Sequence, residues 1–368
     1  MYSPMKGKRI FQGLAALFFL ISGGAGNVTS PQRAENVLNA DLIPVSGEVS
    51  ASGEPTFNAT CPGFGASGYP FPSFPYPSEP APSLLPEADP LVLPLKQAGR
   101  IFLIEAVIDG VNGNLVFDTG ARELLLNKTY FRNHLSVDMV NSMGITGDVA
   151  RVDLITARRV EFCGMVFERL TAGVTDLSHI EDRRGVKILG VVGYSLLKKF
   201  EVLFDPLNGQ LTLFRTDASG RRSNGIYPLF KADHLQKMPG SGSVVFMKGS
   251  IAGKSLNFCF DTAAETNVIS SSSHKLVLAT ISVTRRTSLK GAGSRVSEVL
   301  YGTMNDFLLG DRKIENMDTV VTSLLSLREA YNTSLDGILG YSFFHNGEVS
   351  VNFKTREIGI RFVKGGEE

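Results

Sequence analysis

The sequence has 368 residues and a formal net charge of +1. A chain of this length usually divides into two folded units, and its content of 43% hydrophobic and 20% charged residues is sufficient for globular cores. The balanced charge gives no basic field for nucleic acid, so we expect no nucleic-acid partner. The five histidines show no metal-ligand spacing, and no dinucleotide-binding loop is complete, so we expect no metal and no cofactor.

The N-terminus has the layout of a signal peptide. Basic residues up to Arg9 precede an apolar run at 14–21 and small residues at 22–26. This run is shorter than the roughly 20 apolar residues that span a bilayer. We therefore expect residues 1–26 to be a signal peptide, no stable membrane span after its removal, and export to the periplasm, cell envelope or medium. The alternative is a membrane anchor that stays attached.

Residues 27–90 are rich in Pro, Gly and Ser and show neither helical nor strand periodicity. Such a composition predicts a disordered segment, with a pro-segment that covers an active site as the alternative. Only three cysteines occur, Cys61, Cys163 and Cys259. An odd number leaves at least one unpaired, and we expect Cys259 to fill a core position as a small hydrophobe.

From Leu91 onward, short apolar runs alternate with Gly and Asn turns, a pattern typical of β-rich domains. This pattern occurs twice, which predicts two homologous lobes: lobe one, residues 91–223, and lobe two, residues 224–368. In each lobe an apolar strand leads into an Asp-Thr pair. The expected strands and the sequences that follow them are 101–108 and 113–117 before Asp118-Thr119-Gly120-Ala121, and 243–248 and 255–260 before Asp261-Thr262-Ala263-Ala264.

A second matched feature lies downstream. Lobe one has Gly, two aliphatic residues, Gly, Tyr and Ser at 190–195, and lobe two has the same pattern at 337–342. In each lobe two further strands follow. The expected strands are 200–204 with 210–214 in lobe one, and 348–353 with 357–362 in lobe two.

An Asp-Thr-Gly-Ala sequence at a strand end, followed by an aliphatic-aliphatic-Gly strand, resembles the lobes of retropepsin-like and pepsin-like aspartic peptidases. The resemblance covers about residues 92–363. It implies an all-β, bilobal aspartic-peptidase-like fold with two β-barrel-like lobes and a catalytic dyad of Asp118 and Asp261. Two neighbouring carboxyl groups share a proton, so that one can deprotonate water while the other protonates the scissile carbonyl.

The same resemblance assigns supporting roles. It implies that Thr119 and Thr262 hydrogen-bond across the lobes and that amides after each aspartate donate to the carboxylates, with Gly120 allowing the chain to turn closely. Lobe two departs from the family pattern, because Ala263 stands where lobe one has Gly120. A positive φ at this position would penalise Ala by about 1 kcal/mol or more, whereas an extended backbone would tolerate it.

Glycine-rich hairpins between each aspartate and its downstream glycine are candidates for substrate-covering flaps, with ordinary turns as the alternative. Arg122 and Glu265, each four residues after an aspartate, have opposite charges and are hypothesised to pair across the cleft, with two independent charges as the alternative. The flap candidates are Gly144, Ile145, Thr146 and Gly147 in lobe one, and Gly291, Ala292 and Gly293 in lobe two.

These features predict an aspartic endopeptidase that acts on peptide or protein substrates. Both half-sites lie in one chain, so we expect a monomer. One alternative is a catalytically dead peptide-binding module that keeps the cleft but has lost its chemistry through Ala263. A second is a β-rich cell-envelope protein whose repeats serve assembly only.

Overall fold

The computed structural model describes residues 82–143, 149–223, 229–240, 243–290 and 296–363, and two short strands, β1 (Ile10–Phe11) and β2 (Leu20–Ile21). The two flap candidates, 144–147 and 291–293, lie outside the described residues. So do most of the expected signal peptide and the Pro-rich segment up to residue 81. The part of that segment that is described contacts lobe one, where Ser83 N donates to Val166 O at 2.7 Å and Arg215 N donates to Asp89 Oδ1 at 3.1 Å.

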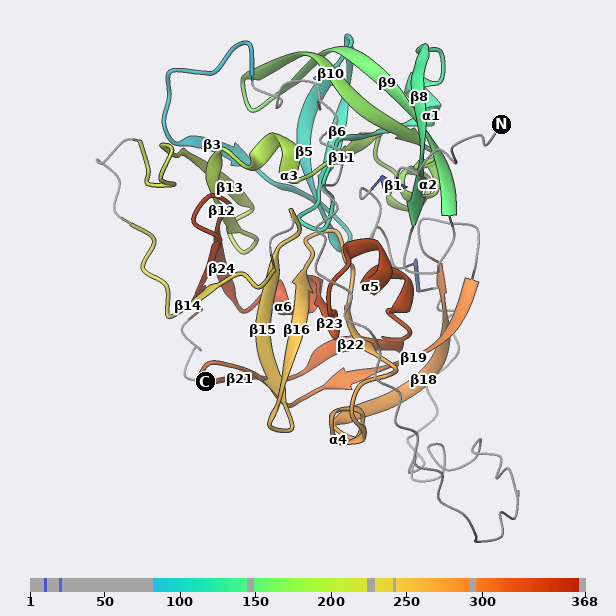
Figure 1. The fold of residues 1–368 in the computed structure, drawn as a ribbon, viewed down its shortest axis with the longest axis vertical. Helices are drawn as coiled ribbons and strands as arrows, with labels where there is room; N and C mark the ends of the chain where they lie inside the picture. Colours follow the sequence, from blue (N-terminus) through green and yellow to red (C-terminus); the bar gives the residue numbers. More distant parts are fainter. Residues whose placement is uncertain are drawn as a thin grey trace, which may run out of the picture. The chain divides into compact units, whose positions relative to one another are not determined.

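Lobe one is built on a nine-stranded sheet. Its order is β1-β8-β9-β10-β7-β11-β6-β5-β4, and β5 also pairs with β9, so that the sheet curls on itself (Figure 1). The strands are β4 (Lys96–Ala98), β5 (Ile101–Ile108), β6 (Val111–Phe117), β7 (Leu125–Asn127), β8 (Ser136–Met143), β9 (Val149–Phe162), β10 (Met165–Thr175) and β11 (Ile188–Val192).

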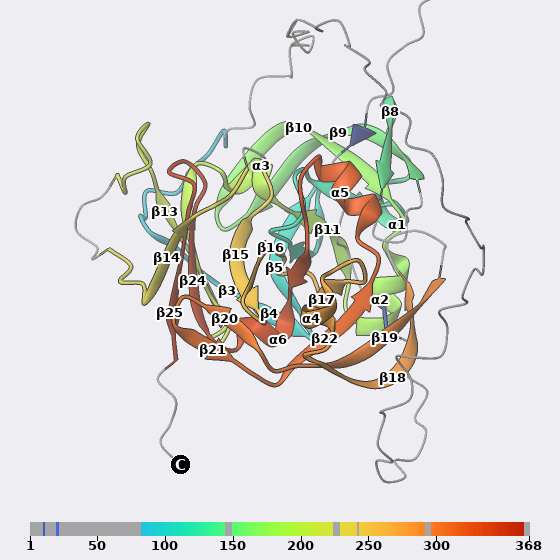
Figure 2. The same ribbon diagram turned by 60° about the horizontal axis from the view of Figure 1, so that its bottom comes forward.

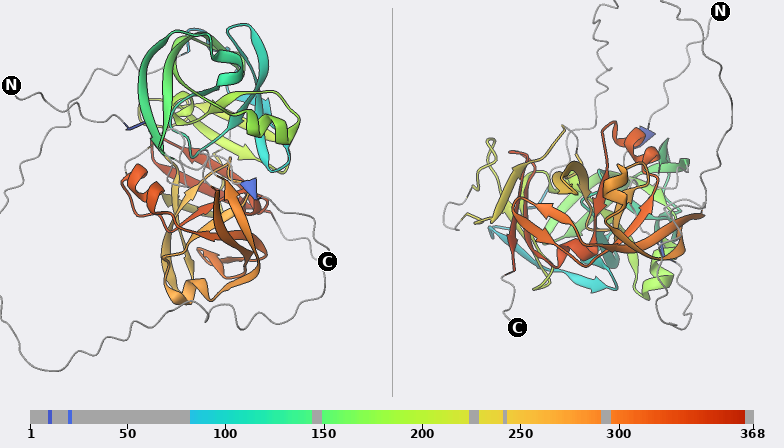
Figure 3. Two further views of the ribbon diagram at one scale, coloured as in Figure 1. Left: turned by 90° about the vertical axis from the view of Figure 1, so that its right-hand side faces the viewer. Right: turned by 90° about the horizontal axis from the view of Figure 1, so that it is seen from below.

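Lobe two repeats this plan in a ten-stranded sheet. Its order is β2-β18-β19-β22-β17-β23-β16-β15-β20-β21. Figure 3 shows lobe one, in cyan and green, beside lobe two, in orange and red. The strands are β15 (Phe246–Ile251), β16 (Lys254–Phe260), β17 (Asn267–Ser270), β18 (Ile281–Lys290), β19 (Val296–Met304), β20 (Phe307–Leu309), β21 (Arg312–Ile314), β22 (Met317–Thr322) and β23 (Gly337–Leu339).

A six-stranded sheet joins the lobes. Its order is β14-β25-β24-β12-β13-β3, and each lobe supplies three consecutive strands (Figure 2). The lobes meet where β12 pairs antiparallel with β24, with Leu203 opposite Ser350. The strands are β3 (Leu91–Pro94), β12 (Phe200–Asp205) and β13 (Gln210–Arg215) from lobe one, and β14 (His234–Lys237), β24 (Gly347–Asn352) and β25 (Glu357–Phe362) from lobe two.

The described helices are short. Two of them, α2 and α5, have seven residues, and each is followed by a residue in the left-handed conformation, Gly185 with φ 63° and Asn332 with φ 48°. A left-handed residue satisfies the last carbonyls of a helix and ends it. The helices are α1 (Lys128–Phe131), α2 (Ser178–Arg184), α3 (Tyr194–Leu197), α4 (Lys275–Leu278), α5 (Leu325–Tyr331) and α6 (Tyr341–Phe344).

The expected all-β, bilobal architecture is confirmed, with one strand displaced. The expected strand 243–248 begins later, as β15, and runs to Ile251. The turn after it is only two residues long, Ala252 with φ 50° and Gly253 with φ 70°. Two successive positive φ values define the tight hairpin turn that matches strand twist, so fewer residues are needed than the sequence suggested.

The hydrophobic core continues from one lobe into the other. Phe102 and Phe204 of lobe one have ring centroids 5.0 Å apart, and Phe204 lies 5.6 Å from Phe344 of lobe two. Phe344 in turn lies 5.0 Å from Phe260, the residue before Asp261. These buried aromatic contacts connect the strand that leads to Asp261 with lobe one.

Candidate active site

Each aspartate of the predicted dyad follows directly after a buried strand. Asp118 follows β6 and Asp261 follows β16, and their amides donate to Val192 O and Leu339 O, both at 3.0 Å. Strand β11 lies between β6 and β7, and β23 lies between β16 and β17 in the same way. The downstream glycine strand therefore supports both ends of the aspartate loop in each lobe.

The two downstream glycines are required by close backbone contact. A β-carbon at Gly193 would lie 2.1 Å from Ala121 O, and one at Gly340 would lie 2.6 Å from Ala264 O. Both glycines have negative φ, −131° and −120°, so the requirement is one of space. The shared Gly-Tyr-Ser pattern thus marks the place in each lobe where the backbone after the glycine strand is in close contact with the loop that follows the aspartate.

Thr119 and Thr262 link the two loops reciprocally. Thr119 N donates to Thr262 Oγ1 and Thr262 N donates to Thr119 Oγ1, both at 3.1 Å. Each hydroxyl also donates to the opposite lobe, from Thr119 to Phe260 O at 2.6 Å and from Thr262 to Phe117 O at 2.7 Å. All four bonds are buried, and they fix the spacing between the strands that end at the two aspartates.

The two carboxyl groups converge beside Gly120. A β-carbon there would lie 2.9 Å from Asp261 Oδ2 and 3.1 Å from Asp118 Oδ1. Asp118 is 1% exposed and Asp261 is 0% exposed. Gly120 N and Ala121 N donate to Asp118 Oδ1 at 2.7 and 3.0 Å, and Ala263 N donates to Asp261 Oδ1 at 2.9 Å.

Burial raises the pKa of both carboxyl groups. The pKa of Asp118 lies well above its ordinary value because of burial and then because of the charge on Asp261, although the Gly120 amide opposes the rise. Burial raises the pKa of Asp261 to about 6, and the amide of Ala263 and the Asp118 carboxyl limit the rise. Two neighbouring carboxyls that cannot both ionise readily will share one proton near neutral pH.

Ala263 fits the second loop. It is fully buried against apolar side chains of lobe one that include Val116 and Ala121. Ala263 is not one of the described residues that have a positive φ, so it has no left-handed backbone strain. Its amide makes the hydrogen bond to Asp261 that Gly120 N makes to Asp118.

The predicted pair of Arg122 and Glu265 is wrong. Glu265 forms an ion pair with Arg184, the last residue of α2, and the two side chains are 9% and 13% exposed. Arg122 Nε instead contacts Glu123 Oε1 at 3.1 Å. Charge symmetry in the sequence did not identify the partner of Glu265, because Arg184 lies on a helix and is 62 residues after Arg122 in the sequence.

A second arginine of lobe one also contacts lobe two. Arg100, between β4 and β5, donates through Nη1 to Glu265 O at 3.3 Å and pairs through Nη2 with Asp318 Oδ2 at 2.8 Å. Tyr331, the last residue of α5, donates its hydroxyl to Gly120 O at 3.3 Å. Sequence reasoning missed Arg100, Arg184 and Tyr331. The available signal was positional, since Arg184 and Tyr331 each stand nine residues before the second glycine of the repeated motif.

Cys259 occupies the core position expected for it. It is fully buried next to the lobe-two loop and unpaired. Burial raises the pKa of its thiol well above the ordinary value, and the charges of the two aspartates raise it further. A thiol that resists ionisation is a poor nucleophile, which agrees with a packing role.

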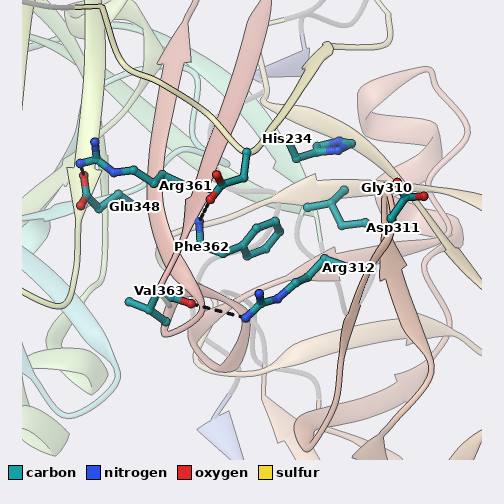
Figure 4. A pocket seen from close by; sticks show the side chains of 10 residues that line it. His234, Gly310, Asp311, Arg312, Glu348, Arg361, Phe362 and Val363 are labelled. Atoms are coloured by element: carbon teal, nitrogen blue, oxygen red, sulfur yellow. Dashed lines mark hydrogen bonds and ion pairs between the residues drawn. The ribbon is translucent and has the colours of Figure 1, made fainter. Parts of the chain in front are cut away.

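One cavity among the described residues lies away from the aspartates. It has a volume of about 740 Å³ and is lined by residues that include His234, Arg312 and Phe362 (Figure 4). Two further lining residues, Arg361 and Glu348, form an ion pair. Among the described residues no cluster of His, Cys, Asp and Glu could hold a metal ion, and none of the helices there is long and apolar enough to cross a bilayer.

A comparison with protein-family models agrees with the sequence resemblance. Residues 247–343 match the family model described as aspartyl protease. No curated protein sequence matches the chain. Among solved structures, the crystal structure of aspartic proteinase from Irpex lacteus is similar over 74% of this chain and 96% of that chain, with 14% identity and a TM-score of 0.46. The resemblance to aspartic peptidases is confirmed by the family match, which includes Asp261 and Gly340.

Proposed function

We propose that this protein is an aspartic endopeptidase that hydrolyses peptide bonds with a water molecule activated between Asp118 and Asp261. One observation carries the proposal. Two buried carboxyl groups from equivalent loops converge beside Gly120, and the threonines that follow them are linked by reciprocal hydrogen bonds. Buried carboxyls held without ion pairs are costly for stability, and such groups concentrate at functional sites.

Burial raises the pKa of both carboxyl groups, so we take the dyad to enter the reaction with one shared proton. In the proposed scheme Asp118 carries this proton, and the ionised Asp261 accepts a proton from water. The water oxygen attacks the scissile carbonyl carbon as Asp118 protonates the carbonyl oxygen. In the collapse of the resulting diol, Asp261 gives the proton it took from water to the amine nitrogen and one diol hydroxyl returns a proton to Asp118. The C–N bond breaks, the amine leaves, and the dyad is again singly protonated, with the proton on Asp118.

The proposed substrate is an extended peptide bound as an added strand, with main-chain hydrogen bonds for affinity and side-chain pockets for specificity. The aspartyl protease match of lobe two supports a peptide substrate. Since both aspartates come from one chain, we propose that a monomer is active. Export after removal of residues 1–26 is part of the proposal and is supported by the basic, apolar and small-residue pattern of that segment.

The proposal is tested by cleavage of an unfolded protein mixture between acid and neutral pH. Asp118→Asn and Asp261→Asn should each abolish cleavage. Asp217→Asn is a matched control, because this carboxylate is exposed and its hydrogen bonds are to Ser219 and Arg221 in its own turn. Loss in only the Asp118 variant would make lobe two an accessory.

The rival is a peptide-binding module without catalysis. It predicts that the wild type binds unfolded peptides at every pH and releases them intact. The two functions also differ in pH dependence, since a dyad that needs one proton gives a bell-shaped rate profile. Peptide binding without any cleavage products would replace the peptidase proposal with this alternative.

A further inference from the structure

The helices α2 and α5 occupy equivalent places in the two lobes, and each sends its last residue across the lobe boundary. Arg184 pairs with Glu265 in the lobe-two loop, and Tyr331 donates to Gly120 O in the lobe-one loop. Each loop is therefore supported by the helix of the opposite lobe. The chemistry differs, because one contact is an ion pair to a side chain and the other is a hydrogen bond to the backbone.

The Tyr331 contact falls on the peptide group that serves Asp118. Gly120 O belongs to the peptide unit between Gly120 and Ala121, and the amide of that unit donates to Asp118 Oδ1 at 3.0 Å. A hydroxyl that donates to a carbonyl polarises the peptide and strengthens its N–H as a donor. The chain of bonds therefore runs from the Tyr331 hydroxyl, through one peptide unit, to the carboxylate.

The Tyr331 side chain is held in place by packing. Its ring meets Phe246 edge to face, with centroids 5.8 Å apart and an interplanar angle of 88°. It also packs against the lobe-two cluster that contains Cys259 and Ala264. Burial, followed by the charges of Cys259 and the two aspartates, raises the pKa of Tyr331 well above its ordinary value, so its hydroxyl stays protonated as a donor.

We propose that Tyr331 is a positioning residue for Asp118, which orients and polarises the Gly120–Ala121 peptide from the opposite lobe. This proposal rests on the peptidase function proposed above, but it goes beyond the dyad and the threonine pair. The 3.3 Å contact is long for a hydroxyl donor, so the effect is that of one modest hydrogen bond. Among the described hydrogen bonds, none from lobe one reaches Ala263 O, the counterpart of Gly120 O. Arg184 is directed to the Glu265 side chain, and Arg100 donates to Glu265 O.

The test is Tyr331→Phe, which removes only the hydroxyl. Loss of the polarised donor weakens the Ala121 hydrogen bond to ionised Asp118 and raises the pKa of Asp118, since hydrogen bonds to a carboxylate lower its pKa. We expect the alkaline limb of the rate profile to move up by about half a pH unit, and kcat to fall roughly five-fold with KM nearly unchanged. A purely structural role would not move the limb.

The carboxyl titration is also read directly, by ¹³C NMR of aspartate-labelled protein with assignments from the Asp118→Asn variant. This measurement needs no turnover, so it decides the Tyr331 inference even if the wild type cleaves no peptide and the peptidase proposal fails. Replacing Tyr331 with 3-fluorotyrosine, a stronger hydrogen-bond donor, should shift the Asp118 titration in the opposite direction.

Tyr130→Phe is the matched control, since the Tyr130 hydroxyl donates to Glu181 within lobe one. This variant should leave kcat and both limbs of the pH–rate profile unchanged. The inference is overturned if Tyr331→Phe folds with the wild-type unfolding midpoint and leaves the Asp118 titration where it was. It is also overturned if Tyr130→Phe moves that titration equally.

Discussion

The buried Asp261 makes the stability of the protein depend on pH in a direction opposite to that of most carboxylates. Its folded-state pKa is about 6, whereas an aspartate in an unfolded chain titrates near 3.9. Well below pH 4 the group is protonated in both states. As the pH rises toward 6, the unfolded chain releases the proton first, so unfolding becomes more favourable.

The magnitude follows from the difference of about two pKa units, at 1.36 kcal/mol for each unit. The wild type should therefore lose about 3 kcal/mol of unfolding free energy between pH 4 and pH 7 on account of this one group. Asp261→Asn cannot ionise and keeps a side-chain oxygen that can accept from Ala263 N. The variant should approach the wild type as the pH falls below 4 and exceed it by about 3 kcal/mol at pH 7.

Urea unfolding of both proteins at several pH values measures the difference, with the midpoint compared at constant slope. Asp217→Asn serves as a control of opposite sign. Hydrogen bonds from Ser219 and Arg221 lower the pKa of Asp217, so its contribution to stability is present at neutral pH and lost in acid. A stability difference between Asp261→Asn and wild type that is the same at pH 4 and pH 7 would refute the reasoning.

Three further substitutions test the supports of the site. Gly193→Ala places a methyl group 2.1 Å from a loop carbonyl oxygen, so it should lower the free energy of unfolding in urea by about 2–3 kcal/mol. The control is Gly110→Ala, at a position with open space but positive φ, which should lower it by only about 1 kcal/mol. Equal losses would contradict the close-contact argument. Thr262→Val removes one donated and one accepted buried hydrogen bond, so it should lower the free energy of unfolding by about 2–4 kcal/mol and lower kcat. An unchanged urea midpoint would show that the threonine link is dispensable. Arg184→Met leaves the Glu265 carboxylate buried and without its ion-pair partner, so it should lower the free energy of unfolding by about 3 kcal/mol. Adding Glu265→Gln to the same chain should restore most of this loss. Additive effects in this double-mutant cycle would show that the two side chains are not coupled.

The sequence alone was sufficient for the architecture because its main signals are local and repeated. Short apolar runs that end at Asp118 and Asp261 are separated by Gly and Asn turns, and this pattern can be recognised without knowledge of distant contacts. The repeated Gly-Tyr-Ser pattern marked two places where a β-carbon would collide with a loop carbonyl. Because the same steric requirement holds in both lobes, glycine occurs at the equivalent position of each copy, and comparison of the two copies revealed it.

What surrounds the two aspartates was decided by tertiary structure. The partner of Glu265 is Arg184 and not Arg122, and the contact of Tyr331 with Gly120 joins residues 211 positions apart. Sequence symmetry shows that two positions are equivalent, but it does not show which side chain crosses the lobe boundary. That choice depends on where the ends of α2 and α5 lie once the six-stranded sheet has joined the lobes. The raised pKa values of the dyad have the same origin, because burial appears only when both loops meet.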